Sequence, residues 1–229
     1  KRGQAEQYQK YKAKNIRIKD KDLQVDGHAQ QLIAVESLSL GYNMPLFSDV
    51  SFSVRAGERV QIVGRNGAGK TTFVEATCAT ASGLKLTSTI FGGLIDCSPQ
   101  LVIGRYEQEI DSAYLDMTLG QAIAEIYRSS GQAVNHEVIT QTLIEYLFER
   151  SDSEVPIRQL SGGQKARVQL IAMLAHRPNL LILDEPTNHL DLPSIEELET
   201  ALKKYSGAVL YISHDSYFAQ AVGGEIIQI

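Results

Sequence analysis

The segment from Gly64 to Thr71, with the sequence GRNGAGKT, matches the pattern GxxxxGK[ST], whose glycines and lysine are spaced to hold phosphate groups. It follows an apolar segment typical of a strand and precedes a segment typical of a helix. In such a loop the backbone N–H groups turn toward phosphate oxygens, and the positive end of the helix dipole lies at the same place. We expect Lys70 to contact the terminal phosphates of a nucleotide and the hydroxyl of Thr71 to bind Mg²⁺. The residues expected to hold the phosphates are Gly64, Asn66, Gly67, Ala68, Gly69, Lys70, Thr71 and Thr72.

A second chemical motif ends in two adjacent carboxylates. Residues 180–183 are apolar without a break, which is typical of a strand buried on both faces, and Asp184 and Glu185 follow directly. Asp184, at the tip of such a strand, can hold Mg²⁺ through water beside Thr71. Glu185 points elsewhere and can polarise the water that attacks the γ-phosphate. Together with the glycine-rich loop, this pair predicts hydrolysis of a nucleoside triphosphate.

Strands that alternate with helices are expected to position these groups. Apolar runs and alternating patterns predict strands at residues 31–40, 51–54, 58–63, 101–106, 180–183, 208–212 and 225–229, and helices from Lys70, over 119–129, over 137–148, over 162–175 and from Pro193. Ala56-Gly57 predicts a hairpin turn between strands 51–54 and 58–63. The alternation predicts a mostly parallel α/β sheet, with the helical insert between 106 and 161 as its own lobe.

The composition is that of an ordinary globular domain. The chain has 229 residues, of which 43% are apolar, and its formal net charge of −5 argues against a basic nucleic-acid binder. No apolar run approaches the length of about 18 residues that a membrane-spanning helix needs. Cys78 and Cys97 stand in no metal-binding spacing.

Residues 1–27 are rich in lysine and glutamine, and the chain does not begin with Met, so we interpret it as a piece of a longer protein. We assign 1–27 to the end of an interdomain linker and 28–229 to the domain, with a helical subdomain over about 109–175.

Between the two chemical motifs lies the sequence LSGGQ, which begins an expected helix and therefore leaves free N–H groups that can receive an anion. With this segment, the order of motifs from about Leu32 onward resembles the ABC ATPase family, whose signature sequence it matches. The resemblance implies a P-loop domain of the α/β class with a mostly parallel core sheet, an antiparallel β-subdomain and a helical lobe that carries the signature. It also implies that the signature contacts the γ-phosphate bound to a second cassette, so that two ATP molecules lie between two domains. The signature residues are Leu160, Ser161, Gly162, Gly163 and Gln164.

The resemblance assigns roles to residues outside these motifs. Tyr42 stands where the family places an aromatic side chain that stacks on adenine, although a turn tyrosine packed on the sheet edge is the alternative. Gln108 matches the Q-loop glutamine that senses Mg²⁺ and the attacking water, with an ordinary surface glutamine as the alternative. His214 matches the switch histidine that contacts the γ-phosphate, and Asp191 closes the D-loop. The implied catalytic residues are Glu185, His214 and Gln108, and the implied Mg²⁺ ligands are Thr71, Gln108 and Asp184.

The residues that follow the carboxylates distinguish branches of the family. Asn188-His189 resembles the ABC-F branch, whereas transporter cassettes usually carry small residues there. ABC-F proteins carry two cassettes on one chain, have no transmembrane domain and act on ribosomes. The resemblance therefore implies a cytoplasmic second cassette whose partners are the first cassette, or another copy of this chain, and the ribosome, in translation or antibiotic resistance. Ser216 departs from the branch, which commonly has an arginine after Ser213-His214-Asp215.

Two other functions stay open on the sequence. One is the ATPase subunit of a membrane transporter, and the other is an ABC-F ATPase of DNA metabolism. The acidic net charge argues against DNA binding by these residues themselves. Stacking on Tyr42 would accept GTP as well as ATP, so the sequence does not decide the base.

Overall fold

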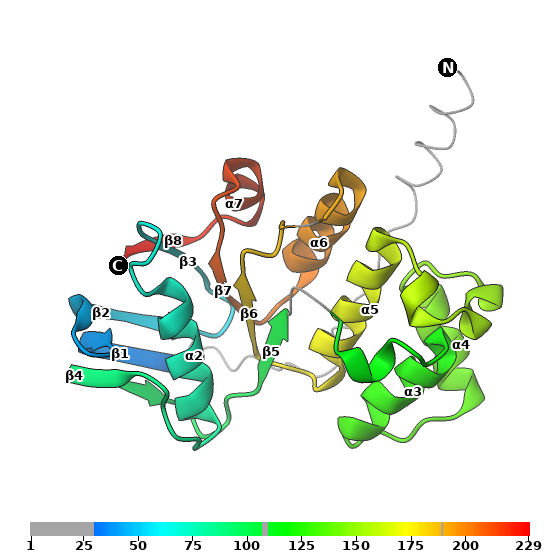
Figure 1. The fold of residues 1–229 in the computed structure, drawn as a ribbon, viewed down its shortest axis with the longest axis horizontal. Helices are drawn as coiled ribbons and strands as arrows, with labels where there is room; N and C mark the ends of the chain where they lie inside the picture. The colour runs from blue at the N-terminus through cyan, green and yellow to red at the C-terminus, as the bar shows by residue number, and fades with distance from the viewer. Residues whose placement is uncertain (1–29, 107–109, 189) are drawn as a thin grey trace. The chain divides into compact units, whose positions relative to one another are not determined.

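A computed structural model describes residues 30–106, 110–188 and 190–229. These residues form two compact units (Figure 1). The sheet unit contains residues 30–106, 176–188 and 206–229, and the helical unit contains residues 110–175 and 190–205. The phosphate-loop sequence and both carboxylates belong to the sheet unit, and LSGGQ belongs to the helical unit.

A parallel sheet forms the centre of the sheet unit, as the alternation of strands and helices predicted. Its strand order is β5-β6-β7-β3-β8, and every neighbouring pair is parallel. All five residues of β7 and the first four of β6 are buried, which explains why both segments are apolar without interruption. The strands are β3 (Arg59–Val63), β5 (Ile103–Tyr106), β6 (Leu180–Asp184), β7 (Ala208–Ile212) and β8 (Glu225–Gln228).

A second, antiparallel sheet has the order β2-β1-β4 and consists of β1 (Gln31–Gly41), β2 (Pro45–Arg55) and β4 (Thr89–Cys97). The expected hairpin at Ala56-Gly57 is wrong, because β2 and β3 belong to different sheets and the turn leads from one sheet into the other. β4 was not predicted from the sequence. Its two adjacent glycines interrupt the alternation, and Gly93 adopts a positive φ of 71° where a side chain would collide with the backbone of β1.

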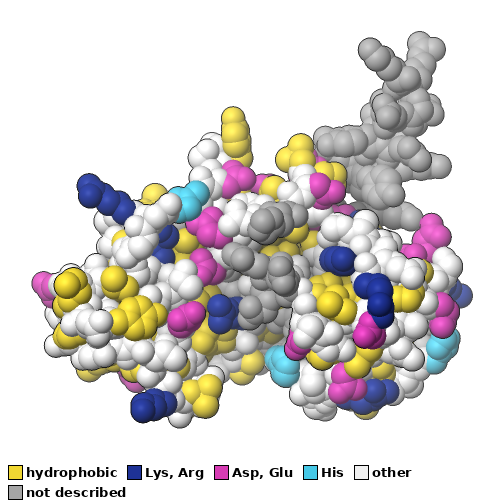
Figure 2. Space-filling model, in the orientation of Figure 1, with side chains coloured by type: hydrophobic (Ala, Val, Ile, Leu, Met, Phe, Trp, Pro, Cys, Tyr) yellow, Lys and Arg dark blue, Asp and Glu magenta, His cyan; other side chains and the backbone are white. Residues whose placement is uncertain are grey.

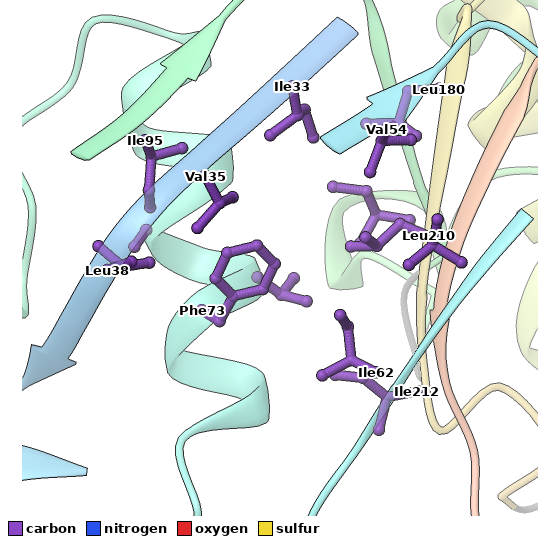
Figure 3. Packing of buried hydrophobic residues seen from close by; sticks show 14 of the residues in the cluster. Ile33, Val35, Leu38, Val54, Ile62, Phe73, Ile95, Leu180, Leu210 and Ile212 are labelled. Atoms are coloured by element: carbon purple, nitrogen blue, oxygen red, sulfur yellow. The ribbon is translucent and has the colours of Figure 1, made fainter. Parts of the chain in front are cut away.

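Helix α2 (Lys70–Ala81) packs against both sheets. Phe73 lies among residues of β1 such as Val35 and Leu38 and residues of the parallel sheet such as Ile62 (Figure 3). Burial of one such side chain stabilises the fold by roughly 1.5–3 kcal/mol. The core therefore fixes the start of α2 relative to the end of β3, and the phosphate-loop sequence connects these two elements. The short α7 (Ser216–Val222) precedes β8.

The helical unit consists of α3 (Leu119–Ser129), α4 (His136–Glu145), α5 (Gly162–Ala175) and α6 (Leu192–Lys204), with short 3₁₀ helices η1 (Ser112–Tyr114), η2 (Arg150–Glu154) and η3 (Ile157–Gln159). The prediction for α3 is confirmed, and a capping box between Thr118 and Gln121 begins it. The expected end of α4 at 148 is wrong. Leu147 has a positive φ of 61°, and the N–H of Phe148 bonds back to the carbonyl of Leu143, which ends the helix at Glu145.

Helix α5, which begins in the signature sequence, contacts α3 and α6. Arg167 of α5 forms two hydrogen bonds with the carboxylate of Glu197 on α6, at 2.8 and 2.7 Å. It also donates to the carbonyl of Leu147 at 3.0 Å and lies over the ring of Phe148. Within the described parts of the chain, no helix has the length and apolar character needed to cross a membrane.

Candidate functional site

The phosphate-loop sequence forms a tight loop between β3 and α2. Gly67 and Gly69 have φ angles of 80° and 102°, which side chains rarely adopt, and Gly69 is the residue that precedes α2. A Cβ atom on Gly64 would collide with the carbonyl oxygen of Ile229, because the chain after β8 runs against the loop. The glycines of the pattern are thus required by backbone geometry, and the first turn of α2 presents its N–H groups at the end of the loop.

Lys70 brings a positive charge to this loop. Its side chain is largely buried, and the ammonium group donates to the carbonyl oxygens of Gly64 at 3.0 Å and Arg65 at 3.1 Å. These bonds hold the lysine along the loop rather than in bulk water. Thr71 is exposed, whereas Thr72 is buried, with 8% of its surface exposed. A lysine, a run of N–H groups and a helix dipole in one place form a donor set that fits the phosphates of a nucleotide.

Asp184 and Glu185 lie at the same edge of the parallel sheet as this loop. β6, β7 and β3 are neighbours and parallel, so their carboxyl ends meet there. Glu185 adopts a positive φ of 48°, and its N–H donates to the carbonyl of Ile212 at the end of β7, at 2.9 Å. Such a conformation costs about 1–3 kcal/mol for a residue with a side chain and is typical of functional sites.

The carboxylate of Glu185 contacts His214 in two ways. Its Oε2 accepts a hydrogen bond from the backbone N–H of His214 at 3.2 Å, and its Oε1 lies 3.3 Å from Nε2 of the same residue. The Glu185 side chain is 17% exposed and that of His214 is 60% exposed. The second contact is a hydrogen bond only when Nε2 carries a proton, and Oε1 is otherwise buried without a hydrogen-bond partner among the described residues. A carboxylate oxygen in this condition can accept a proton or orient a water molecule.

Gln61 of β3, which the sequence analysis did not single out, lies next to this pair. It is 9% exposed, and its Nε2 donates to the carbonyl oxygen of Ser213 at 3.3 Å. The sequence signal that could have indicated Gln61 is an amide side chain between apolar residues in the strand sequence RVQIV. Asp215, on the other side of His214, accepts hydrogen bonds from the N–H groups of Tyr217 and Phe218 and begins α7.

Tyr42 lies in the turn between β1 and β2 and is half exposed. β2 begins three residues later, and an added Cβ on Gly69 would lie 3.0 Å from Cδ1 of Phe47 and 3.1 Å from Cβ of Leu46. The antiparallel sheet therefore touches the phosphate loop close to the turn that carries Tyr42. Apolar side chains also gather on the surface over this sheet (Figure 2).

Two predicted residues, Gln108 and His189, lie outside the described residues. Tyr106 ends β5 and is buried, and burial raises the pKa of its hydroxyl to about 12. The tyrosine is therefore neutral under physiological conditions.

Mg²⁺ prefers oxygen ligands, and the hydroxyl of Thr71 and the carboxylate of Asp184 supply them. These two described residues fit the ion by their chemistry.

The LSGGQ sequence begins α5 within the helical unit. Ser161 and Gln164 form a capping box, in which the N–H of Gln164 donates to Oγ of Ser161 at 3.2 Å and the N–H of Ser161 donates to Oε1 of Gln164 at 3.0 Å. Ser161 and Gly162 are exposed, whereas Leu160 is buried. A Cβ on Gly163 would lie 2.9 Å from Oγ of Ser194, so this glycine permits the close approach of α6.

Asp191 begins α6 beside the same glycine. Its carboxylate accepts hydrogen bonds from the N–H and the hydroxyl of Ser194. The carboxylate of Asp191 and the signature glycine therefore contact the same serine. The structure leaves the role of the signature toward a second cassette as a prediction.

Comparison with known proteins places the chain among ATP-binding cassettes. A family model described as "ABC transporter" matches residues 47–188. The ribosome protection protein VmlR of Bacillus subtilis is 36% identical over 176 residues, which cover 76% of this chain and 30% of that protein. ABC transporter F family member 4 of Arabidopsis thaliana is 36% identical over 198 residues, which cover 85% of this chain and 26% of that protein. The chain spans about a third of the length of the curated relatives it matches.

Solved structures have the same fold at lower identity. An ATP-binding subunit of an ABC transporter superposes with a TM-score of 0.66 at 22% identity, covering 86% of this chain and 85% of that chain. The ATP-binding cassette MJ0796, in a dimeric post-hydrolysis state with ADP and Pi, superposes with a TM-score of 0.63 at 22% identity, covering 86% of this chain and 94% of that chain. The predicted fold class is confirmed.

Proposed function

The chain belongs to the ABC transporter family as one of its ATPase cassettes, and from this premise we propose that its residues 64–72 bind MgATP and that Glu185 directs water onto the γ-phosphate. The observation that carries the proposal is the contact of the Glu185 carboxylate with both the main chain and the side chain of His214. This contact lies at the sheet edge where the phosphate loop begins. The proposed general base, Glu185, and the phosphate loop therefore lie at the same edge of one sheet.

Each residue then has a distinct task. The N–H groups of the loop and the ammonium of Lys70 bind the phosphate oxygens and oppose the negative charge that grows during transfer. Thr71 and Asp184 hold Mg²⁺, together with Gln108, and the ion when bound supplies positive charge to the phosphate oxygens. Glu185 holds the water in line and takes up its proton, while His214 keeps the carboxylate in place and contacts the γ-phosphate. Tyr42 stacks on the base.

We further propose that a second cassette completes the site. The exposed start of α5, with Ser161 and Gly162, offers free N–H groups that can contact the γ-phosphate held by a partner. MJ0796, which has the same fold, is described as a dimer. The partner is either another cassette of the same protein or a second copy of this chain.

The ABC-F branch and a role on the ribosome are the finer part of the proposal. Asn188-His189 supports the branch, as does the similarity to ABC transporter F family member 4. The similarity to the ribosome protection protein VmlR supports the ribosome as partner and the cytoplasm as location. The similarity to the solved ATP-binding subunit of a transporter, at 22% identity, shows the fold alone, whereas the matched family model is described as "ABC transporter" and supports a transporter as the alternative.

Co-sedimentation with ribosomes tests this part. The protein with Glu185→Gln should pellet with ribosomes in ATP and stay in the supernatant without it, because hydrolysis no longer releases the closed form. Adding Lys70→Ala to Glu185→Gln is the matched control and should abolish pelleting, since ATP no longer binds. A folded, ATP-loaded protein that never pellets would instead favour a membrane-transporter or DNA partner.

A further inference from the structure

Gln61 is a polar residue in the interior of the parallel sheet. It stands at the middle of β3, the strand that leads into the phosphate loop, and its neighbours Val60 and Ile62 are buried. Strands β7 and β8 pair with β3 on its two sides. An amide in such a place is unfavourable unless it forms hydrogen bonds, and the bond to the carbonyl of Ser213 satisfies one of its donors.

The acceptor of this bond belongs to the peptide unit that joins Ser213 to His214. The carbonyl oxygen of that unit accepts from Gln61 at 3.3 Å, and its N–H donates to Oε2 of Glu185 at 3.2 Å. One peptide plane is therefore bound at both ends, by a buried amide on β3 and by the carboxylate that follows β6. Because a peptide unit is rigid, fixing its carbonyl also fixes the direction of its N–H.

We propose that Gln61 is a positioning residue for hydrolysis, which orients the Ser213–His214 peptide so that its N–H holds the carboxylate of Glu185. This inference rests on the proposed function of Glu185. Hydrogen bonds in series also polarise each other, so the bond from Gln61 strengthens the donor that faces the carboxylate. The same peptide carries the His214 side chain, whose Nε2 lies 3.3 Å from Oε1. Gln61 thus acts on both contacts of Glu185 without touching the nucleotide.

A purely structural role for Gln61 makes a different prediction. Gln61→Met has a similar length and shape but no donor, and Gln61→Glu keeps the shape while directing a carboxylate at the carbonyl of Ser213. Under the structural role, either change lowers the midpoint of thermal unfolding and affects ATP binding and turnover through the folded fraction alone. Under the positioning role, kcat falls while nucleotide affinity stays.

The experiment measures kcat, the Kd of a fluorescent ATP analogue and the ¹⁵N–¹H resonance of the His214 amide in the wild-type chain and in Gln61→Met. We expect kcat to fall about tenfold, which corresponds to about 1.4 kcal/mol, and the Kd to change by less than about twofold. The His214 amide proton should move upfield and exchange faster, because its bond to the carboxylate is weakened. Thr142→Val, which removes a buried hydroxyl that bonds the carbonyl of Val138 and the hydroxyl of Tyr127, is the matched control and should leave kcat and this amide unchanged.

A double substitution tests the route of the effect. If Gln61 acts through Glu185, then adding Gln61→Met to Glu185→Gln should not lower the residual turnover further. A further tenfold loss in that background would overturn the proposal, as would Gln61→Met with an unchanged kcat or an unchanged His214 amide. If the wild-type protein shows no turnover with its second cassette present, the proposed function fails, whereas the His214 amide still tests the positioning by Gln61.

The wild-type chain offers a measurement that needs no variant. The side-chain amide protons of Gln61 should exchange slowly with solvent, because the group is buried and bound. Exchange as fast as that of the exposed Gln121 would overturn the proposal even if both variants fail to fold.

Discussion

Glu185 is held by the main chain of His214 as well as by its side chain, with Oε2 3.2 Å from the backbone nitrogen and Oε1 3.3 Å from Nε2. The two contacts differ in what a substitution can remove. The backbone bond survives any change of the histidine side chain, whereas the imidazole contact does not. This difference separates the placement of the carboxylate from the chemistry of the imidazole and leads to the first two predictions.

Glu185→Gln should abolish most turnover and leave ATP binding intact. The amide keeps the shape of the side chain and can still accept the bond from the His214 N–H, but it is a far weaker base. General-base catalysis contributes about 10²–10⁴-fold, so we expect a loss of kcat in that range. Steady-state ATPase assays and nucleotide titration measure both quantities. Glu75→Gln, which alters an exposed carboxylate of α2, serves as control and should retain wild-type kcat.

His214→Ala should lower kcat less than Glu185→Gln does. The backbone N–H that holds Oε2 stays, and only the imidazole contacts are lost. We expect a loss of about 100-fold, at the low end of the range of about 10²–10³-fold for one positioned hydrogen-bond donor. Because the side chain is 60% exposed, thermal stability should change little. A variant as inactive as Glu185→Gln would contradict this order, because it would show that turnover needs the imidazole as much as the carboxylate.

Lys70→Ala should prevent nucleotide binding. The ammonium is held along the loop by two carbonyls and is the one charge of the loop sequence that is buried. We expect the Kd for ATP to rise by at least about 100-fold, since charge-assisted bonds to phosphate contribute about 1.5–3 kcal/mol each. Isothermal titration in the presence of Mg²⁺ measures the change. Lys85→Ala removes an exposed lysine beyond α2 and should bind as the wild type does, and unchanged affinity in Lys70→Ala would contradict the phosphate-loop assignment.

The sequence predicted the parallel sheet and the loop because local patterns determine both. A short apolar run such as 208–212 is typical of a buried strand, and the glycine pattern follows from backbone conformations that other residues rarely adopt. β4 and the true partners of β2 were missed, since adjacent glycines hide one pattern and a two-residue turn does not reveal that the chain changes sheets.

Contacts within the site were beyond sequence reasoning for a different reason. Gln61 and Ser213 are far apart in the chain, and their bond depends on β3 and β7 being neighbours. The positive φ of Glu185 likewise depends on its bond to the end of β7. Such relationships follow from strand order, which motif spacing does not specify.

Arg167→Leu should strongly destabilise the helical unit. The side chains of Arg167 and Glu197 are only 13% and 20% exposed, and the arginine also binds the carbonyl of Leu147. Removing one partner leaves a largely buried carboxylate unpaired, which costs about 3–5 kcal/mol. Urea unfolding followed by circular dichroism measures this loss, and Glu197→Gln should restore part of it in the double variant, because the unpaired charge is then gone.

The exposed ion pair between Arg128 and Glu125 provides the control. Its side chains are 63% and 45% exposed, although its distance of 3.0 Å is similar. Arg128→Leu should therefore reduce the free energy of unfolding by less than about 1 kcal/mol, since surface pairs are screened by water and salt. If both variants lose the same stability, burial does not explain the contribution of Arg167, and the contact of its guanidinium group with the Phe148 ring would be the remaining cause.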